Sequence, residues 1–458
     1  MVGSLCRQGA PPRCVRLGLL LRLAATNMKE NEIHGSAGRV AAGRLVEGFD
    51  LRQPPPGFYD DPYPFYSALR LTEPVKVLGD GSVFLTRYDD VAAMYRNPAA
   101  SSDKKQEFRS KYGDTPLYEH HTTSLVFNDA PIHPRVRRPL LGAVNQRAIT
   151  RMEPGVQTLV DQLLDAMQAK SQSATAGAAM HPAVPGAVDL IGDFAAAIPV
   201  EVIGNLLAFP REDRGPLRGW SLAILGALEP VPTPAMHEAG NRAVVEFMEY
   251  LRILLADRRA NPLDPEEDVL TRLLQPGSDG EQLSERQLLH NCIFLLNAGH
   301  ETTTNLIGNG VHALLTHPDQ LQRLARSPQL LSSAIEEMLR HQSPLQLNNR
   351  RLTDATRIGD RVFDSGTLVT LCVGAANRDP AQFPDPDRFD VARKPNRHLA
   401  FGHGEHACAG MNVARMEARI AVGALLARFP GIALAGEPVR DRRVRFRGFS
   451  SLPVSLSS

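Results

Sequence analysis

The sequence predicts a mainly α-helical protein with a smaller β part, an α+β fold. Long apolar-periodic stretches in 130–170, 284–317 and 410–428 indicate helices, and short β-rich runs bounded by turn residues indicate a minor sheet. A third observation is "FGHGEHACAG" at 401–410, where one cysteine lies among three glycines directly before the last helix. Because glycines free the backbone for close approach, this loop is expected to be shaped around a bulky partner.

Composition excludes several classes of protein. The chain has 458 residues, 43% of them hydrophobic and 22% charged, and its 51 basic residues nearly balance 50 acidic ones. No nucleic-acid partner is expected from this balance. The cysteines are too few and too scattered for a disulfide framework, so we expect a reducing, cytoplasmic compartment. They are Cys6, Cys14, Cys292, Cys372 and Cys408.

The first 29 residues contain no acid and include the apolar stretch "LGLLLRLAA". This stretch is too short to span a bilayer and Arg22 interrupts it, so no membrane anchor is expected. A leader peptide, a disordered extension or a start at Met28 remain alternatives. We therefore predict an N-terminal extension over 1–45 and a single domain over 46–458.

The remaining elements follow in order. A proline-rich entry leads to a β-hairpin in "PVKVLGDGSVFLTRY", with its turn at Gly-Asp-Gly, and 130–170 is expected to be helical with Pro134 in the first turn. The small-residue segment 171–189 is expected to be a surface loop. A long helix is predicted from the N-cap Ser284 to just before Pro318, followed by a helix at 328–342, short strands after 356, a proline-rich coil and the final helix.

Cys408 is open to four interpretations from the residues alone. It can be a buried structural cysteine, a catalytic nucleophile, a zinc ligand together with His403 and His406, or the thiolate ligand of a larger group. Its place before a helix N-terminus favours the thiolate over the thiol.

Polar residues interrupt the apolar face of the long helix in "LLNAGHETTTN". Ala298 and Gly299 remove side-chain bulk, so a flat ligand can lie against the helix there. Glu301 and Thr302 place an acid and an alcohol beside it, which is a possible proton path. The alternative is a solvated turn of a surface helix.

Two further sets of residues are weak signals by themselves. Glu337 and Arg340 face the same way on a helix and can be no more than an ion pair. His133 and Arg137 share a helical face, and Arg350 and His398 lie in separate segments. Together these four basic residues can clamp a dianionic cofactor edge.

Taken together, these motifs resemble the cytochrome P450 family of haem-thiolate monooxygenases, in its soluble bacterial branch. "FGHGEHACAG" is similar to the haem-binding loop, "AGHETT" to the oxygen-activating segment, and Glu337 with Arg340 to the Glu-x-x-Arg pair. "NRDPAQFPDPDRF" is similar to the coil that precedes the loop. The resemblance runs from about residue 48 to the C-terminus.

The resemblance implies a cytochrome P450-type fold that holds haem b (iron protoporphyrin IX) between the long central helix and the cysteine loop. Cys408 would be the axial metal ligand, and Glu301 and Thr302 would deliver protons during O2 activation. The implied cofactor-binding residues are His133, Arg137, Arg350 and His398 at the propionates, with Ala298, Gly299, Phe401, Gly402 and Gly410 around the haem. Arg388 would complete a structural network with Glu337 and Arg340.

The resemblance also implies that one oxygen atom enters an apolar small-molecule substrate. Electrons from NAD(P)H would arrive through a separate ferredoxin and ferredoxin reductase, with "RKPNRH" (393–398) offering positive charge to the ferredoxin, and the protein would be a monomer. The substrate pocket would be lined by the segment before residue 130, by 297–302 and by Leu345–Asn349. The alternative is a peroxide-using or redox-neutral haem-thiolate enzyme; a gas sensor and a zinc hydrolase are more distant ones.

Overall fold

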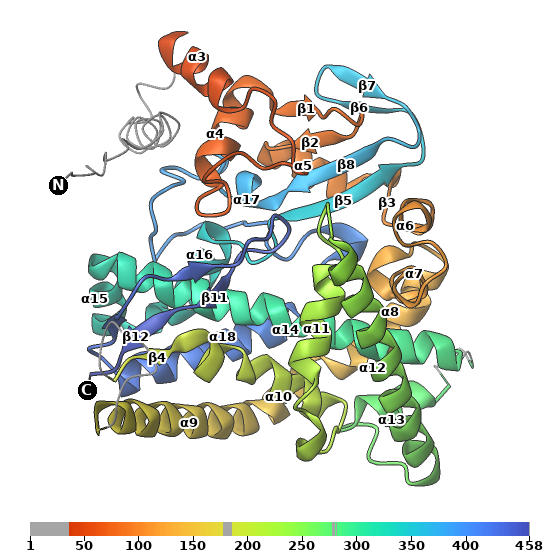
Figure 1. Ribbon diagram of the computed structural model, residues 1–458, viewed down its shortest axis with the longest axis vertical. Helices are drawn as coiled ribbons and strands as arrows, with labels where there is room; N and C mark the ends of the chain where they lie inside the picture. The colour runs from red at the N-terminus through yellow and green to blue at the C-terminus, as the bar shows by residue number, and fades with distance from the viewer. Residues whose placement is uncertain (1–35, 177–185, 277–279, 281, 458) are drawn as a thin grey trace, which may run out of the picture.

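Helix α14 runs through the middle of a mainly helical protein, with a small sheet at one end (Figure 1). The computed structural model describes residues 36–176, 186–276, 280 and 282–457. The helices are α3 (Ser36–Leu45), α4 (Tyr63–Thr72), α5 (Tyr88–Arg96), α6 (Lys105–Tyr112), α7 (Pro116–Thr123), α8 (Ile132–Ala143), α9 (Gln146–Ala176), α10 (Ala197–Leu206), α11 (Leu217–Gly226), α12 (Pro234–Ala260), α13 (Val269–Leu274), α14 (Glu285–Thr316), α15 (Pro318–Arg326), α16 (Leu331–His341), α17 (Val373–Ala376) and α18 (Met411–Arg428). Because α14 packs against α7, α10, α11, α12, α16 and α18, most of its surface is covered.

The main sheet has five strands in the order β1-β2-β8-β5-β3. Only the β2 and β8 pair is parallel; the other neighbours are antiparallel. Smaller sheets pair β4-β12-β9, β10-β11 and β6-β7. The strands are β1 (Val75–Val77), β2 (Val83–Leu85), β3 (Ala100–Ser101), β4 (Val188–Asp189), β5 (Leu347–Leu352), β6 (Thr356–Ile358), β7 (Arg361–Phe363), β8 (Leu368–Cys372), β9 (Ala433–Leu434), β10 (Val439–Arg440), β11 (Phe449–Ser451) and β12 (Pro453–Ser455). The predicted α+β class is therefore confirmed.

Several expected elements are found at their expected places. The hairpin is β1 and β2, and α14 begins at a capping box in which the Ser284 hydroxyl accepts from the Gln287 amide at 3.3 Å. Pro318 starts the next helix, so α14 ends before it, and Pro134 lies in the first turn of α8. In the described part of the chain, no helix combines the length and apolarity needed to cross a membrane.

Other expectations need correction. The segment 130–170 forms two helices, because the Asn145 side chain accepts from the Ala148 amide at 2.9 Å and starts α9 as a cap. α9 then continues to Ala176, into the expected surface loop, while 177–185 lie outside the described residues. Of the expected extension over 1–45, residues 36–45 form α3, whose Ala42 is buried in an apolar cluster with α4.

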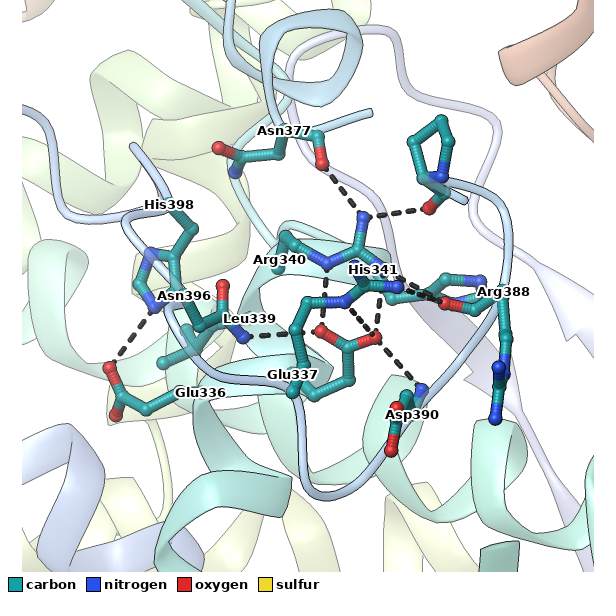
Figure 2. A network of polar contacts seen from close by, with 12 residues as sticks. Glu336, Glu337, Leu339, Arg340, His341, Asn377, Arg388, Asp390, Asn396 and His398 are labelled. Carbon is teal, nitrogen blue, oxygen red and sulfur yellow. Dashed lines mark hydrogen bonds and ion pairs between the residues drawn. The ribbon is translucent and has the colours of Figure 1, made fainter. Parts of the chain in front are cut away.

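The predicted pair of Glu337 and Arg340 is fully buried on α16 and forms two hydrogen bonds, from Arg340 Nε at 2.7 Å and Nη2 at 2.8 Å (Figure 2). The other Arg340 donors bind the main-chain carbonyls of Asn377 at 2.9 Å, Pro386 at 2.7 Å and Arg388 at 3.1 Å. All five N–H groups of this guanidinium are therefore satisfied by one helix and one coil.

Arg388 takes part in this network through its main-chain carbonyl and not through its side chain. Its guanidinium is exposed and points away from the carboxylate, and only its carbonyl takes part (Figure 2). The side chain that reaches Glu337 is that of Arg393, with Nε at 3.1 Å, and the Asn396 amide donates to the same carboxylate at 3.1 Å. The turn from Asp385 to Arg388 faces Arg388 outward and leaves the next arginine facing the helix.

This network fixes the coil that leads to the cysteine loop. Asn377, whose carbonyl binds Arg340, also accepts the Leu399 amide on its side-chain oxygen at 2.7 Å. Leu399 in turn accepts the amide of Gly402, at 2.9 Å, within the loop. The buried pair is thus linked to the functional loop through three successive hydrogen bonds.

We predict that Arg340→Ala lowers the free energy of unfolding by about 3–5 kcal/mol, because it leaves the buried Glu337 carboxylate with Arg393 alone as counter-ion and removes three hydrogen bonds to the coil. Urea unfolding followed by circular dichroism measures this. Arg323→Ala is the matched control: its exposed ion pair with Asp390, at 2.9 Å, holds the same coil, and its loss is expected to cost below about 1 kcal/mol. Equal effects of the two substitutions would contradict the role given to the buried pair.

Candidate functional site

The cysteine loop, 401–410, folds back on itself between the coil and α18. The Cys408 amide donates to the Phe401 carbonyl at 2.8 Å, which closes the loop. Gly402 and Gly404 have φ angles of +66° and +74°, in the left-handed region. A Cβ atom at Gly404 would lie 2.6 Å from the Tyr95 carbonyl oxygen, so only glycine lets the loop approach α5 this closely.

Cys408 lies in a setting with opposing effects on its ionisation. Burial raises the pKa of the thiol, whereas the Gly410 amide and the positive charges of Arg137 and Arg415 lower it. The sequence-based expectation that a helix N-terminus alone favours the thiolate is therefore incomplete, because burial outweighs it. A cation bound at the sulfur would reverse this balance, since metal coordination deprotonates a thiol.

Phe401 connects the loop to α16 and α18. Its ring lies 4.7 Å from the Arg415 guanidinium carbon. Arg415 also binds the Glu336 carboxylate through Nε at 2.7 Å and Nη2 at 2.8 Å, and His398 donates to that carboxylate at 3.2 Å. Although burial opposes it, these hydrogen bonds lower the pKa of Glu336 to about 2. A permanently charged carboxylate thus holds the loop's two flanks together.

The zinc alternative is not supported. The His406 ring lies against that of His133, tilted by 38° with 4.0 Å between centroids, and donates to Asp129 at 3.2 Å. His403 lines an open depression beside Arg96. Across the ranges that the structure describes, no three His, Cys, Asp or Glu side chains are grouped to hold a metal ion.

The central helix has an open face in its middle. Ala298 is exposed and Thr302 is partly exposed, although Asn297, His300 and Glu301 around them are buried. Since α14 is covered by other helices, this exposure marks an internal space. The binding of a flat ligand at Ala298 stays a prediction, for which this accessible face leaves the helix surface free.

Gly299 has a different role from the expected one. A Cβ atom there would lie 2.9 Å from Cδ1 of Ile203, so this glycine allows α10 to pack closely on α14. The reason is helical geometry, because Gly299 is rotated by about 100° from Ala298 and faces the neighbouring helix.

Glu301 and Thr302 are adjacent in sequence, but the structure does not bring their side chains together. The Thr302 hydroxyl donates to the Ala298 carbonyl at 2.9 Å, on the open face. The Glu301 carboxylate is buried and binds Arg443 of the C-terminal segment, and its second oxygen has no hydrogen-bond partner. Burial raises the pKa of Glu301 and Arg443 opposes that shift.

The four basic residues fall into two groups. Arg350 is only 4% exposed and makes no ion pair with any described carboxylate; it donates to the Asn349 carbonyl at 2.9 Å and to Asn348 at 3.2 Å. His133 is equally buried, and its Nε2 has no hydrogen-bond partner. A buried guanidinium and a buried imidazole N–H without anionic partners fit the carboxylates of a haem.

The other two basic residues already have protein partners. Arg137 Nη2 donates to the Ala407 carbonyl at 2.5 Å, so it lies against the cysteine loop. His398 donates to Glu336 through Nε2, and its Nδ1 accepts the Ala400 amide at 3.3 Å, so both ring nitrogens are engaged within the protein. Their predicted binding to propionates stays a prediction.

Sequence reasoning missed three arginines of the site: Arg393, Arg415 and Arg443. Arg415 lies in the second turn of α18, seven residues after Cys408, and its place near the start of the helix behind the loop could have pointed to it. Arg443 is 142 residues away from Glu301, and no local pattern connects them.

Comparisons with known proteins agree with this geometry. The family model for Cytochrome P450 matches residues 220–454. The chain is 38% identical over 413 residues to Cytochrome P450 107B1 of Saccharopolyspora erythraea, covering 87% of this chain and 95% of that protein. It is 37% identical over 409 residues to the vitamin D(3) 25-hydroxylase of Pseudonocardia autotrophica, covering 87% and 94%.

A solved structure gives the same result for the fold. The crystal structure of P450BioI in complex with an acyl carrier protein ligated to hexadec-9Z-enoic acid matches with a TM-score of 0.80 and 34% identity, covering 87% of this chain and all of that one. The family model, the relatives and the fold agree with a cysteine loop and an open central-helix face that fit a haem. The chain therefore belongs to the cytochrome P450 family, and it is a haem-dependent monooxygenase.

Proposed function

We propose that this enzyme hydroxylates or epoxidises an apolar small molecule, with electrons supplied by a separate ferredoxin and its reductase. The observation that carries the proposal is the open face of α14, where Ala298 and the Thr302 hydroxyl are accessible in the middle of a helix that other helices cover. When bound with a cysteine thiolate ligand, haem supplies an electron-rich iron at which O2 is reduced and its O–O bond is cleaved.

The protein's own residues would hold the cofactor from several directions. Cys408 would bind the iron from the closed glycine loop, and the Gly410 amide would donate to its sulfur. Arg350 and His133 would bind the propionates, since both are buried without an anionic partner in the described protein. Arg137 and His398 would act at the same edge after giving up their present contacts.

Proton delivery would be shared between Thr302 and Glu301. The Thr302 hydroxyl lies on the open face, where rotation about χ1 redirects it from the Ala298 carbonyl toward a reacting oxygen atom. The unpartnered oxygen of Glu301 can hold a proton, because burial favours the neutral acid. Arg443 keeps this carboxyl group on the side of α14 that faces the C-terminal segment.

We predict that reduced wild-type protein with carbon monoxide gives a strongly red-shifted Soret band, and that Cys408→His abolishes it because imidazole replaces the thiolate ligand. The visible spectrum after dithionite reduction measures this. Cys372→Ala, at a buried cysteine of β8, is the control and should keep the band. A retained red-shifted band in Cys408→His would exclude Cys408 as the ligand.

We predict that Thr302→Ala folds and binds haem but diverts NAD(P)H consumption into hydrogen peroxide, lowering product yield per reductant by about tenfold or more. Peroxide, product and NAD(P)H are measured in the same assay. Thr316→Ala is the matched control, because Thr316 makes the same back-bond, at 2.9 Å to the His312 carbonyl, at the exposed end of α14. Unchanged coupling in Thr302→Ala would remove this hydroxyl from the mechanism.

Only some of the basic residues in 393–398 are available to bind a ferredoxin. Arg393 binds Glu337 and His398 binds Glu336, which leaves Lys394 and Arg397 exposed. Arg397 lines an open depression of about 410 Å³ together with Arg96 and His403. This basic depression supports docking of an acidic electron donor beside the cysteine loop.

We predict that electron transfer from the cognate ferredoxin slows as ionic strength rises, and that Arg397→Glu lowers its rate at low salt by about tenfold, because charge steering is lost. Stopped-flow reduction under carbon monoxide measures the rate. Arg242→Glu, at an exposed position of α12, is the charge-matched control. A rate that is independent of salt in both variants would overturn the electrostatic contact.

A further inference from the structure

Lys104, the residue before α6, is a buried lysine whose Nζ atom donates no hydrogen bond of good geometry within the described structure. Its side chain is 4% exposed, and its Nζ atom lies 3.1 Å from the Glu107 carboxylate, in an orientation that gives neither atom a hydrogen bond. Burial lowers the pKa of Lys104 to about 8; Glu107 opposes this shift, and repulsion by Arg445 and Arg350 adds to it.

Two more cations lie within reach of this charge. Lys111, on the last turn of α6, is largely buried and donates to the Glu229 carbonyl at 2.7 Å. Arg445, on the segment between β10 and β11, has a buried Nε with no hydrogen-bond partner and a weak contact, at 3.5 Å, from Nη1 to the Leu347 carbonyl. The charge of Arg445 repels both lysines.

The acids around this cluster of Lys104, Lys111 and Arg445 do not balance it. Glu107 lies beside Lys104, and Glu229 binds the Val444 amide at 3.0 Å through one oxygen. Arg445 has no carboxylate within ion-pair distance in the described structure, and Arg350 is proposed above to bind a haem propionate. An interior cation without a counter-ion is costly, and a guanidinium fork matches a carboxylate.

The cluster lies next to the segment that is expected to line the substrate pocket. The Arg445 carbonyl accepts the Gln346 amide at 2.8 Å, and Phe446 pairs with Leu345, so these residues belong to the segment expected to line the pocket. Phe108 of α6 and Phe446 belong to one apolar cluster, which also reaches Phe294 and Leu295 of α14. An apolar wall thus joins the cations to the helix that carries Thr302.

We propose that the substrate is an apolar carboxylic acid whose carboxylate is bound by Arg445 and Lys104, with its hydrocarbon body against this wall. This inference rests on the proposed function, because it names the substrate class of the same site. It makes Arg445 and Lys104 specificity-determining residues, since an alcohol or hydrocarbon of the same length would leave Arg445 without an anion and Lys104 with Glu107 alone. Lys111 adds positive charge nearby but already has a protein acceptor.

The test is spectral titration of the haem-loaded protein with dodecanoate and hexadecanoate and with the alcohols of equal length, repeated by isothermal calorimetry. Each acid is expected to bind with a Kd about tenfold or more below that of its alcohol. Arg445→Gln and Lys104→Gln should each weaken acid binding by about tenfold and change alcohol binding less than about twofold. Arg442→Gln, at an exposed arginine of the same segment, is the control and should change neither.

The inference is overturned if no acid binds more tightly than its alcohol, or if both variants bind the acids as the wild type does. A lower ratio of haem to protein in Arg445→Gln or Lys104→Gln would overturn it differently, by assigning these cations to the haem propionates. If the wild type gives the red-shifted carbon monoxide spectrum but does not prefer acids, only this inference is wrong and the proposed function stands. If the wild type lacks that spectrum, the proposed function itself is wrong.

Discussion

The buried ion pair of Glu337 and Arg340 is the interaction on which the functional loop depends. Neither side chain has contact with solvent. Of the five hydrogen bonds that the Arg340 guanidinium donates, two go to Glu337 and three tie α16 to the coil around Asn377 and Arg388. A charge pair is costly to bury, so it persists only where every donor and acceptor is satisfied. Here the hydrogen bonds donated by Arg340 hold in place a coil that has no regular secondary structure of its own.

The same helix holds the loop a second time, through the neighbouring residue. Glu336 binds both His398, before the loop, and Arg415, after it, while Arg415 covers Phe401. Consecutive glutamates on α16 thus face in two directions, one toward the coil and one toward the cysteine loop. This arrangement lets a glycine-rich loop keep one shape without losing the close backbone approach that its glycines permit.

Positive charge is distributed unevenly inside the protein. Arg340 and Arg443 have buried carboxylate partners, whereas Arg350 and Arg445 have none in the described structure. These two unpaired guanidinium groups lie on neighbouring segments, since Arg445 contacts Leu347 at the start of the strand that carries Arg350. A haem propionate would supply the missing anion at Arg350, and a substrate carboxylate would supply it at Arg445.

The sequence alone determined the features that depend on local chemistry. Ser284 and Pro318 mark the two ends of the central helix, because capping and the missing proline N–H act within one turn. The hairpin follows from its glycine turn. Glu337 and Arg340 could be paired because three residues is a helical contact distance. Spacing within 401–410 was likewise enough to single out Cys408, since loop glycines and cysteine lie within ten residues of one another.

Only the tertiary structure decided which side chains meet across the chain. Arg393 rather than Arg388 reaches Glu337 because a turn in the coil reverses the direction of the side chains, and turns of this kind carry no periodic signal. Gly299 faces Ile203, and Glu301 meets Arg443, because packing of distant segments selects which face of a helix is covered. The cations Lys104 and Arg445 are 341 positions apart and come together only when α6 and the C-terminal segment close over the same space. Which charged side chains pair over long sequence distances is decided by the topology of the fold, so no local pattern of residues predicts it.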